Sequence, residues 1–84
     1  MKNRKVTLSF ADGMDAHGIA LCVQTASQYE SSVRLTDGVR RMNAKSIMGM
    51  MALGLALGDD VTIETDGPDE DAALEAMSAF LAGE

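Results

Sequence analysis

The most informative stretch of this chain is Asn43-Ala44-Lys45-Ser46-Ile47-Met48-Gly49-Met50-Met51, in which a serine precedes a short apolar run. A serine in this position caps a helix, because its hydroxyl accepts a hydrogen bond from a backbone N–H that has no partner in the first turn. The stretch therefore predicts a short helix that starts at Ser46 and ends at about Leu53.

This predicted helix carries more large apolar side chains than one side of it can bury: Ile47, Met48, Met50 and Met51. Two interpretations follow. In the first, these residues belong to the core and the serine only caps the entry to the helix. In the second, some of them stay exposed as a docking face, because unbranched, polarizable methionine side chains are common on surfaces that adapt to partners.

The composition is typical of one small folded domain that spans residues 1–84, with 46% hydrophobic and 24% charged residues. The longest nearly apolar run, residues 47–57, is far shorter than the ~20 residues that span a bilayer. The basic N-terminal residues lead into an alternating segment and lack the continuous apolar core of a signal peptide. We therefore expect a cytoplasmic protein without membrane insertion.

Charge and cysteine content narrow the classes of ligand. Thirteen acidic and seven basic residues give a formal charge of −6, which repels nucleic acid and favours proteins or small molecules as partners. Cys22 is the only cysteine, so no internal disulfide forms, and no Cys/His cluster has metal-ligand spacing. We expect no metal and no cofactor.

The first half of the chain alternates between strand and helix patterns. Residues 5–10 place Val6, Leu8 and Phe10 on one face of a strand, and Asp12-Gly13 ends it. Residues 16–27 have helical spacing, with Asp15 as the N-cap.

The second half continues this alternation. Residues 32–36 and 39–42 predict two strands of a hairpin joined by the two-residue turn Asp37-Gly38. A fourth strand is expected at residues 60–65, followed by a turn at 66–69 and a last helix. The apolar face of that helix contains Ala73, Leu74, Met77, Phe80 and Leu81.

The resulting order is β-α-β-β-α-β-α, with four strands that each have one apolar face. Long amphipathic helices can cover that face. The sequence therefore predicts an α+β fold, an open-faced two-layer sandwich in which a four-stranded antiparallel sheet is covered on one side by helices.

One site for chemistry lies before the first helix, in Gly13-Met14-Asp15-Ala16-His17-Gly18. The start of a helix presents free N–H groups and the positive end of its dipole, which favour a phosphoryl group. The only histidine of the chain lies here, next to a carboxylate.

Over essentially its full length the chain resembles HPr, the phosphocarrier of the bacterial sugar phosphotransferase system. The resemblance rests on residues 43–51, on Gly13 with Ala16, on Gln24, and on Gly67-Pro68-Asp69-Glu70 with Ala73-Leu74. It implies the open-faced sandwich described above. It also implies a phosphorylation site before the first helix, where the family carries a Gly-x-His-Ala-Arg-Pro motif whose histidine accepts phosphate from enzyme I.

Aligned on Gly13 and Ala16, the resemblance places Asp15 at the phosphoacceptor histidine, His17 at the arginine and Gly18 at the proline. Three interpretations of Asp15 remain open: a helix cap, an acyl-phosphate acceptor, or a carboxylate that partly imitates phosphohistidine. His17 is either a surface histidine or itself the acceptor.

The resemblance implies a second site at Ser46, because an ATP-dependent HPr kinase phosphorylates this serine in Gram-positive relatives. It also implies a surface that binds enzyme I, sugar permease components and transcriptional regulators. In this chain the surface comprises His17, Ala20, Gln24, Lys45, Ile47, Met48 and Met51.

Our first interpretation is a divergent HPr-like regulatory or protein-binding module, similar to the catabolite-repression HPr paralogue, which also lacks the histidine but keeps the serine. The alternative is a working phosphocarrier that accepts phosphate at His17 or Asp15. The chain contains no catalytic triad, metal site or nucleotide loop, so we do not expect a self-standing enzyme.

Overall fold

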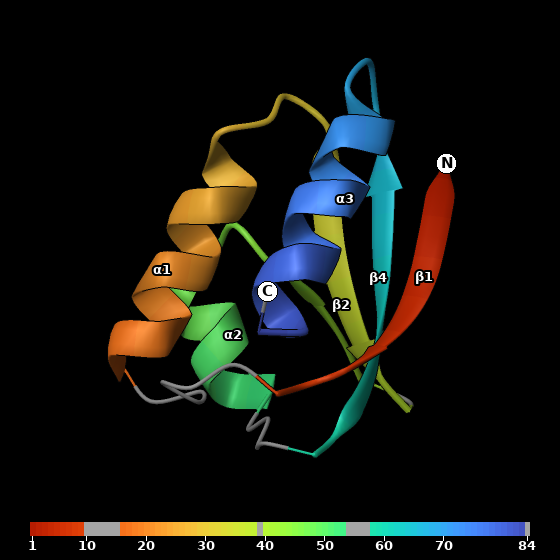
Figure 1. Ribbon diagram of the computed structural model, residues 1–84. Coiled ribbons are helices and arrows are strands. Elements are labelled where there is room, and N and C mark those ends of the chain that lie inside the picture. The colour runs from red at the N-terminus through yellow and green to blue at the C-terminus, as the bar shows by residue number, and fades with distance from the viewer. Residues whose placement is uncertain (10–15, 39, 54–57, 84) are drawn as a thin grey trace.

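The computed structural model describes residues 1–9, 16–38, 40–53 and 58–83. These residues form three helices and four strands. Figure 1 shows how the elements are arranged. In chain order these elements are β1 (Lys2–Thr7), α1 (Ala16–Ser27), β2 (Ser32–Asp37), β3 (Arg40–Asn43), α2 (Ile47–Leu53), β4 (Asp60–Asp66) and α3 (Glu70–Leu81).

The four strands form one antiparallel sheet in the order β1-β4-β2-β3. In β4, Val61, Ile63 and Thr65 are buried, and the residues between them lie on the opposite, more exposed face. All three helices lie on the buried side of the sheet (Figure 1). The predicted α+β two-layer architecture is therefore confirmed.

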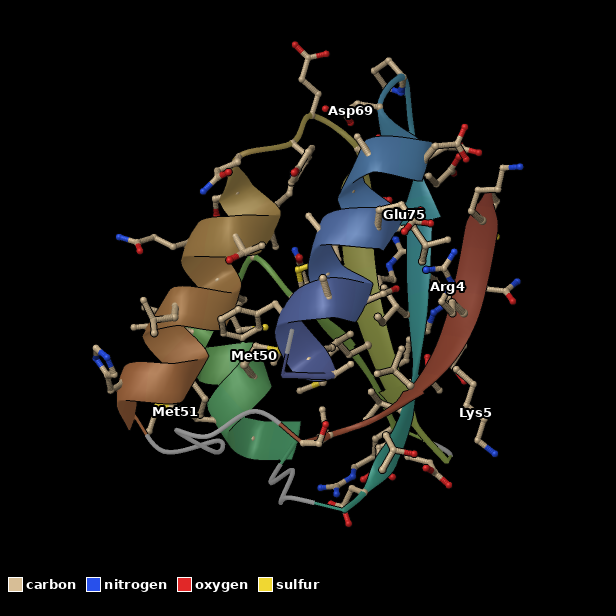
Figure 2. The ribbon with its side chains drawn as sticks, viewed as in Figure 1. Arg4, Lys5, Met50, Met51, Asp69 and Glu75 are labelled. Atoms are coloured by element: carbon tan, nitrogen blue, oxygen red, sulfur yellow. The ribbon has the colours of Figure 1, made fainter. Side chains whose placement is uncertain are left out.

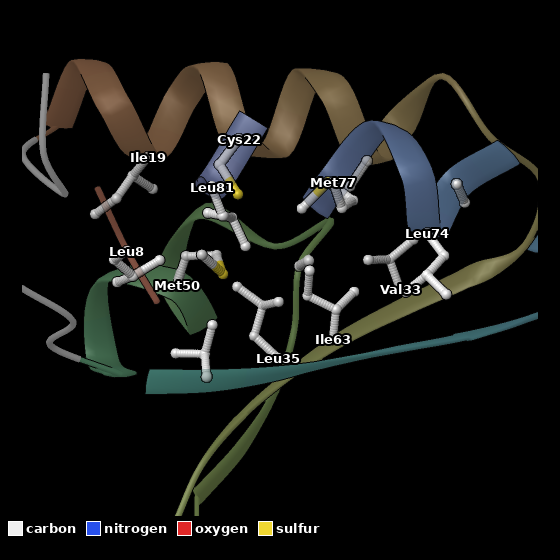
Figure 3. Close-up of a cluster of buried hydrophobic side chains, with 14 residues drawn as sticks. Leu8, Ile19, Cys22, Val33, Leu35, Met50, Ile63, Leu74, Met77 and Leu81 are labelled. Atoms are coloured by element: carbon white, nitrogen blue, oxygen red, sulfur yellow. The ribbon is translucent and has the colours of Figure 1, made fainter. Parts of the chain in front are cut away.

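The core lies between the sheet and the helices (Figure 3). β2 contributes Val33 and Leu35, both fully buried. The predicted apolar face of α3 is confirmed, although Phe80 is only partly buried. The buried hydrophobic residues are Leu8, Ile19, Cys22, Ala26, Val33, Leu35, Ala44, Met50, Val61, Ile63, Ala73, Leu74, Met77 and Leu81.

The bounds of the first strand were predicted wrongly. The ladder with β4 runs from Lys2↔Thr65 to Thr7↔Asp60, not over residues 5–10. Beyond Thr7, the Leu8 N–H still donates to the Asp59 carbonyl at 2.9 Å, and the Ser9 N–H then donates to the Leu81 carbonyl of α3 at 3.0 Å. Phe10 lies outside the described residues, as does the expected turn at 12–13.

Long-range ion pairs explain why basic residues occupy this edge strand. The Arg4 guanidinium lies 2.7 Å from Glu75 Oε1 of α3 (Figure 2), and Lys2 Nζ lies 3.7 Å from Asp71 Oδ1. Both basic residues face the helical layer, where α3 supplies the acidic partners.

The hairpin forms as predicted, but its turn is displaced by one residue. Asp37 pairs with Arg40 in the ladder, so Asp37 ends β2 instead of opening the turn. Its carboxylate lies 3.5 Å from the Arg40 guanidinium, which favours this pairing. Gly38 has φ +65°, a conformation that glycine adopts readily. Val39 lies outside the described residues.

A hydrogen-bonded junction joins the loop after α1 to the turn before α3. The Asp69 carboxylate accepts hydrogen bonds from the backbone N–H groups of Glu30 (3.0 Å) and Ser31 (2.9 Å) and from the Ser31 hydroxyl. Ser31 Oγ accepts a hydrogen bond from the Asp69 N–H at 3.1 Å. Gly67 permits this close approach, because a Cβ there would lie 2.6 Å from Ser31 Cα.

None of the helices that the structure describes is long and apolar enough to cross a membrane.

We expect Ser31→Ala to lower the free energy of unfolding by about 1–3 kcal/mol, because one buried hydroxyl that both donates and accepts is lost. Urea denaturation measures this change. The matched control is Ser32→Ala, since the Ser32 hydroxyl is exposed and lies 3.3 Å from the Asp66 carbonyl oxygen. The control should change stability by no more than about 0.5 kcal/mol. Equal losses in both variants would contradict the role of the junction.

The hydrogen bonds from Ser31 lower the pKa of Asp69. A carboxylate whose pKa is lowered on folding stabilises the folded state above its ordinary pKa of about 3.9, and this contribution disappears as pH falls through the folded-state pKa. We expect Asp69→Asn to lower the Tm at neutral pH. As the pH is lowered, the Tm of the variant should fall less than the Tm of the unmodified protein. Circular dichroism melts from pH 7 to pH 2 measure both. A constant Tm difference across this range would contradict the prediction.

Candidate functional site

The start of α2 is fixed by the serine that the sequence identified. Ser46 Oγ accepts a hydrogen bond from the Gly49 N–H at 3.1 Å, so the predicted cap is confirmed. The turn before it is held by Asn43, whose side-chain Oδ1 accepts a hydrogen bond from the Lys45 N–H at 2.9 Å. The backbone enters this seven-residue helix in a defined direction.

The end of α2 is held by a residue that sequence reasoning missed. Arg40 Nη1 donates to the Ala52 carbonyl oxygen at 3.3 Å, near the last turn of the helix. A cation is favourable at this end of a helix, where the carbonyl groups lack partners. The sequence gives little indication of this contact. Arg40 belongs to β3, before α2 in the chain, and only the folded hairpin brings its side chain close to the end of the helix.

The core anchors the middle of α2 through one methionine. Met50 is fully buried beside Leu8 and Leu35 (Figure 3). Three other large apolar side chains of the helix face solvent: Ile47 is 49% exposed, Met48 83% and Met51 56%. The interpretation that the whole apolar run is core is therefore wrong, because only one side of α2 faces the sheet.

The predicted α1 residues are also exposed. His17, Ala20 and Gln24 recur at helical spacing along α1, and all three lie at the surface. α1 packs against α2 (Figure 1), so the exposed residues come from neighbouring helices. Asp15, which the resemblance aligns with the phosphoacceptor, lies outside the described residues.

Lys45 is tied into the fold more closely than its predicted place at the edge of the surface suggests. It is half-buried, and its ammonium donates to the Tyr29 carbonyl oxygen at 2.7 Å. This bond links the entry of α2 to the segment that follows α1. One of the three N–H donors of this ammonium is therefore engaged within the protein.

The exposed sides of α1 and α2 have little charge. Neither helix contains an Asp, Glu, Lys or Arg residue.

Cys22 of α1 is buried, and burial raises the pKa of its thiol to about 12, so it is not a thiolate nucleophile at neutral pH. Among the described residues no group of three His, Cys, Asp or Glu side chains could hold a metal ion. The chemistry that α2 offers is apolar contact and one serine hydroxyl.

Two methionines of α2 provide a matched test of this arrangement. We expect Met50→Ala to lower the free energy of unfolding by about 2–5 kcal/mol, because it leaves a cavity in the core. Met48→Ala, in the same helix, should change it by less than about 0.5 kcal/mol. Chemical denaturation measures both, and similar losses would contradict the assignment of Met48 to the surface.

Comparison with known proteins identifies the family. Residues 2–83 match the family model described as the PTS HPr component phosphorylation site. The chain is 40% identical over 82 residues to the phosphocarrier protein HPr of Cupriavidus necator, which covers 98% of this chain and 92% of that protein. It is also 40% identical over 81 residues to the HPr-like protein Crh of Bacillus subtilis, covering 96% and 95%.

Solved structures agree with the sequence comparisons. HPr-C-His from Thermoanaerobacter tengcongensis superposes with a TM-score of 0.91 at 36% identity, covering 100% of this chain and 98% of that chain. The Bacillus subtilis Crh, described as a swapped dimer, gives a TM-score of 0.77 at 40% identity, covering 96% and 93%. The chain therefore belongs to the HPr family of the bacterial phosphotransferase system and resembles both its phosphocarriers and its Crh-type members.

Proposed function

We propose that this protein is an HPr-like regulatory module that binds other proteins through α1 and α2 and is controlled by phosphorylation of Ser46. In this proposal Asp15 replaces the phosphoacceptor histidine, so the protein does not pass phosphate from enzyme I to a sugar permease. It is neither an enzyme nor a nucleic-acid-binding protein, and it acts in the cytoplasm.

The observation that carries this proposal is the exposure of Ile47, Met48 and Met51 on a helix fixed at both ends. Exposing three large apolar side chains on a single short helix forgoes the stabilisation of burying them. Such a patch marks a protein interaction site when it is presented rigidly. The buried Met50 and the two capping contacts provide that rigidity, so little order is lost on binding.

Ser46 is well placed to regulate this surface. It immediately precedes Ile47 and lies at the start of the helix that carries the patch. Phosphorylation adds a charge of roughly −1.5 to −2 at neutral pH. Because α1 and α2 contain no Asp, Glu, Lys or Arg, the phosphate adds a concentrated negative charge to a largely apolar surface that has Lys45 beside it. Binding of apolar partners is then weakened and binding of basic partners is strengthened.

The family suggests the classes of partner. Enzyme I, sugar permease components, an HPr kinase and a transcriptional regulator are the candidates. The formal charge of −6 and the engagement of Lys45 with a backbone carbonyl favour protein partners over nucleic acid.

The alternative function is a working phosphocarrier that uses His17 or Asp15. Its support is the family membership together with the exposure of His17, the second residue of α1. An imidazole there can accept a phosphoryl group as a phosphoramidate, and a carboxylate can accept it as an acyl phosphate.

One experiment separates the two functions. Intact-mass spectrometry follows the protein after incubation either with phosphoenolpyruvate and enzyme I or with ATP and an HPr kinase. We expect no adduct in the first reaction, under conditions that fully label a control HPr. In the second we expect one acid-stable phosphoryl group, which Ser46→Ala abolishes.

Asp15→Ala and His17→Ala are the matched variants for the first reaction. An acid-labile adduct that either variant abolishes would overturn the proposal and identify the acceptor of a working phosphocarrier. Absence of an adduct in the kinase reaction would remove the regulatory role of Ser46.

A further inference from the structure

Gly49 lies in the interior of α2, where glycine destabilises a helix relative to alanine. The backbone does not require it. The described glycines with positive φ are Gly38, Gly58, Gly67 and Gly83, and Gly49 is not among them. An alanine can therefore adopt the same helical conformation at position 49.

Packing does not require glycine at this position either. A Cβ added to Gly49 would lie 3.4 Å from both Cβ and Oγ of Ser46 and 3.6 Å from the Asn43 carbonyl oxygen. These are ordinary van der Waals distances. At Gly67, by contrast, a Cβ would lie 2.6 Å from backbone and side-chain atoms of Ser31, so a side chain is excluded there. The first group that a side chain at position 49 would reach is the Ser46 hydroxymethyl group.

The surroundings of Ser46 make this space relevant to chemistry. The residue is half-buried, and Oγ already accepts the Gly49 N–H at 3.1 Å. A methyl group in contact with Oγ would occupy volume on the same side of the hydroxyl. A phosphoryl group bonded to Oγ needs more space than the proton that it replaces, so a narrower surround affects phosphorylation more than it affects the unmodified hydroxyl.

We infer that Gly49 determines the susceptibility of Ser46 to phosphorylation by keeping open the space beside its hydroxyl. This inference rests on the proposed function. In the reaction Ser46 Oγ forms a bond to the γ-phosphorus of ATP as the bond from that phosphorus to the β,γ-bridging oxygen breaks. ADP leaves, and the hydroxyl proton passes to a base of the kinase. Gly49 takes no part in bond making, so it is a positioning residue and not a catalytic one.

The test compares the unmodified protein with Gly49→Ala and Gly49→Leu as substrates of an HPr kinase and ATP. Both substituted residues favour helix, and the Tm of each variant measures whether the fold is retained. We expect kcat to fall at least tenfold for alanine and further for leucine, with KM nearly unchanged. The Tm should stay the same or rise. Met51→Ala is the matched control on α2, and it should raise KM with little effect on kcat, because Met51 belongs to the exposed patch.

Each outcome has a defined meaning. Equal kcat values for the unmodified protein and Gly49→Ala would overturn the inference and leave the regulatory function intact. A rise in KM without a fall in kcat, or a fall in kcat with a lower Tm, would also overturn it, because docking or folding would then be responsible. If the unmodified protein is not phosphorylated on Ser46, the proposed regulatory function fails first and the inference fails with it.

Discussion

The alternation of buried and exposed residues in β2 and β4 is the constraint on which the rest of the structure depends. Val33 and Leu35 of β2 and Val61 and Ile63 of β4 have almost no exposed surface, and all four belong to one face of the sheet. Because only that face is apolar, every helix has to pack on the same side. The other face stays polar, and hydrogen bonds such as that from Thr36 to Glu64 cross it.

This one-sided arrangement determines what α2 can present. α1 and α3 have twelve residues each, and α3 packs on β1 and β4 while α1 packs against both other helices. α2 has seven residues, packs beside β3 and reaches the core mainly through Met50. With so short a helix, contacts at its ends decide its orientation. Ser46 supplies the contact at one end and Arg40 at the other, and Met50 anchors the helix in the core between them.

Local patterns in the sequence were enough to predict the element order, the fold class and the bounds of α1, because helical spacing and strand alternation record which residues face the core. They were not enough to place β1. Lys2 and Arg4 are exposed, so they lack the apolar alternation that indicates a strand, and their acidic partners on α3, Asp71 and Glu75, lie about seventy positions later in the chain. Residue type also could not predict that Met50 is buried and Met48 exposed. Contacts from outside the helix determine which side of α2 faces the sheet. The Ser46 cap was predictable because its partner is three residues away.

The distribution of charge gives the exposed surface its character. Basic side chains are used elsewhere in the fold: Arg4 pairs with α3 and Arg41 pairs with Glu64. Arg40 binds the Ala52 carbonyl near the end of α2, and Lys45 binds the Tyr29 carbonyl in the segment after α1. No Asp, Glu, Lys or Arg belongs to α1 or α2 themselves. If these helices bind partners as proposed, recognition would depend mainly on apolar area and shape and less on long-range electrostatics. Under the proposed function, a single phosphate on Ser46 would place a concentrated negative charge beside this largely apolar surface and so alter which class of partner it favours.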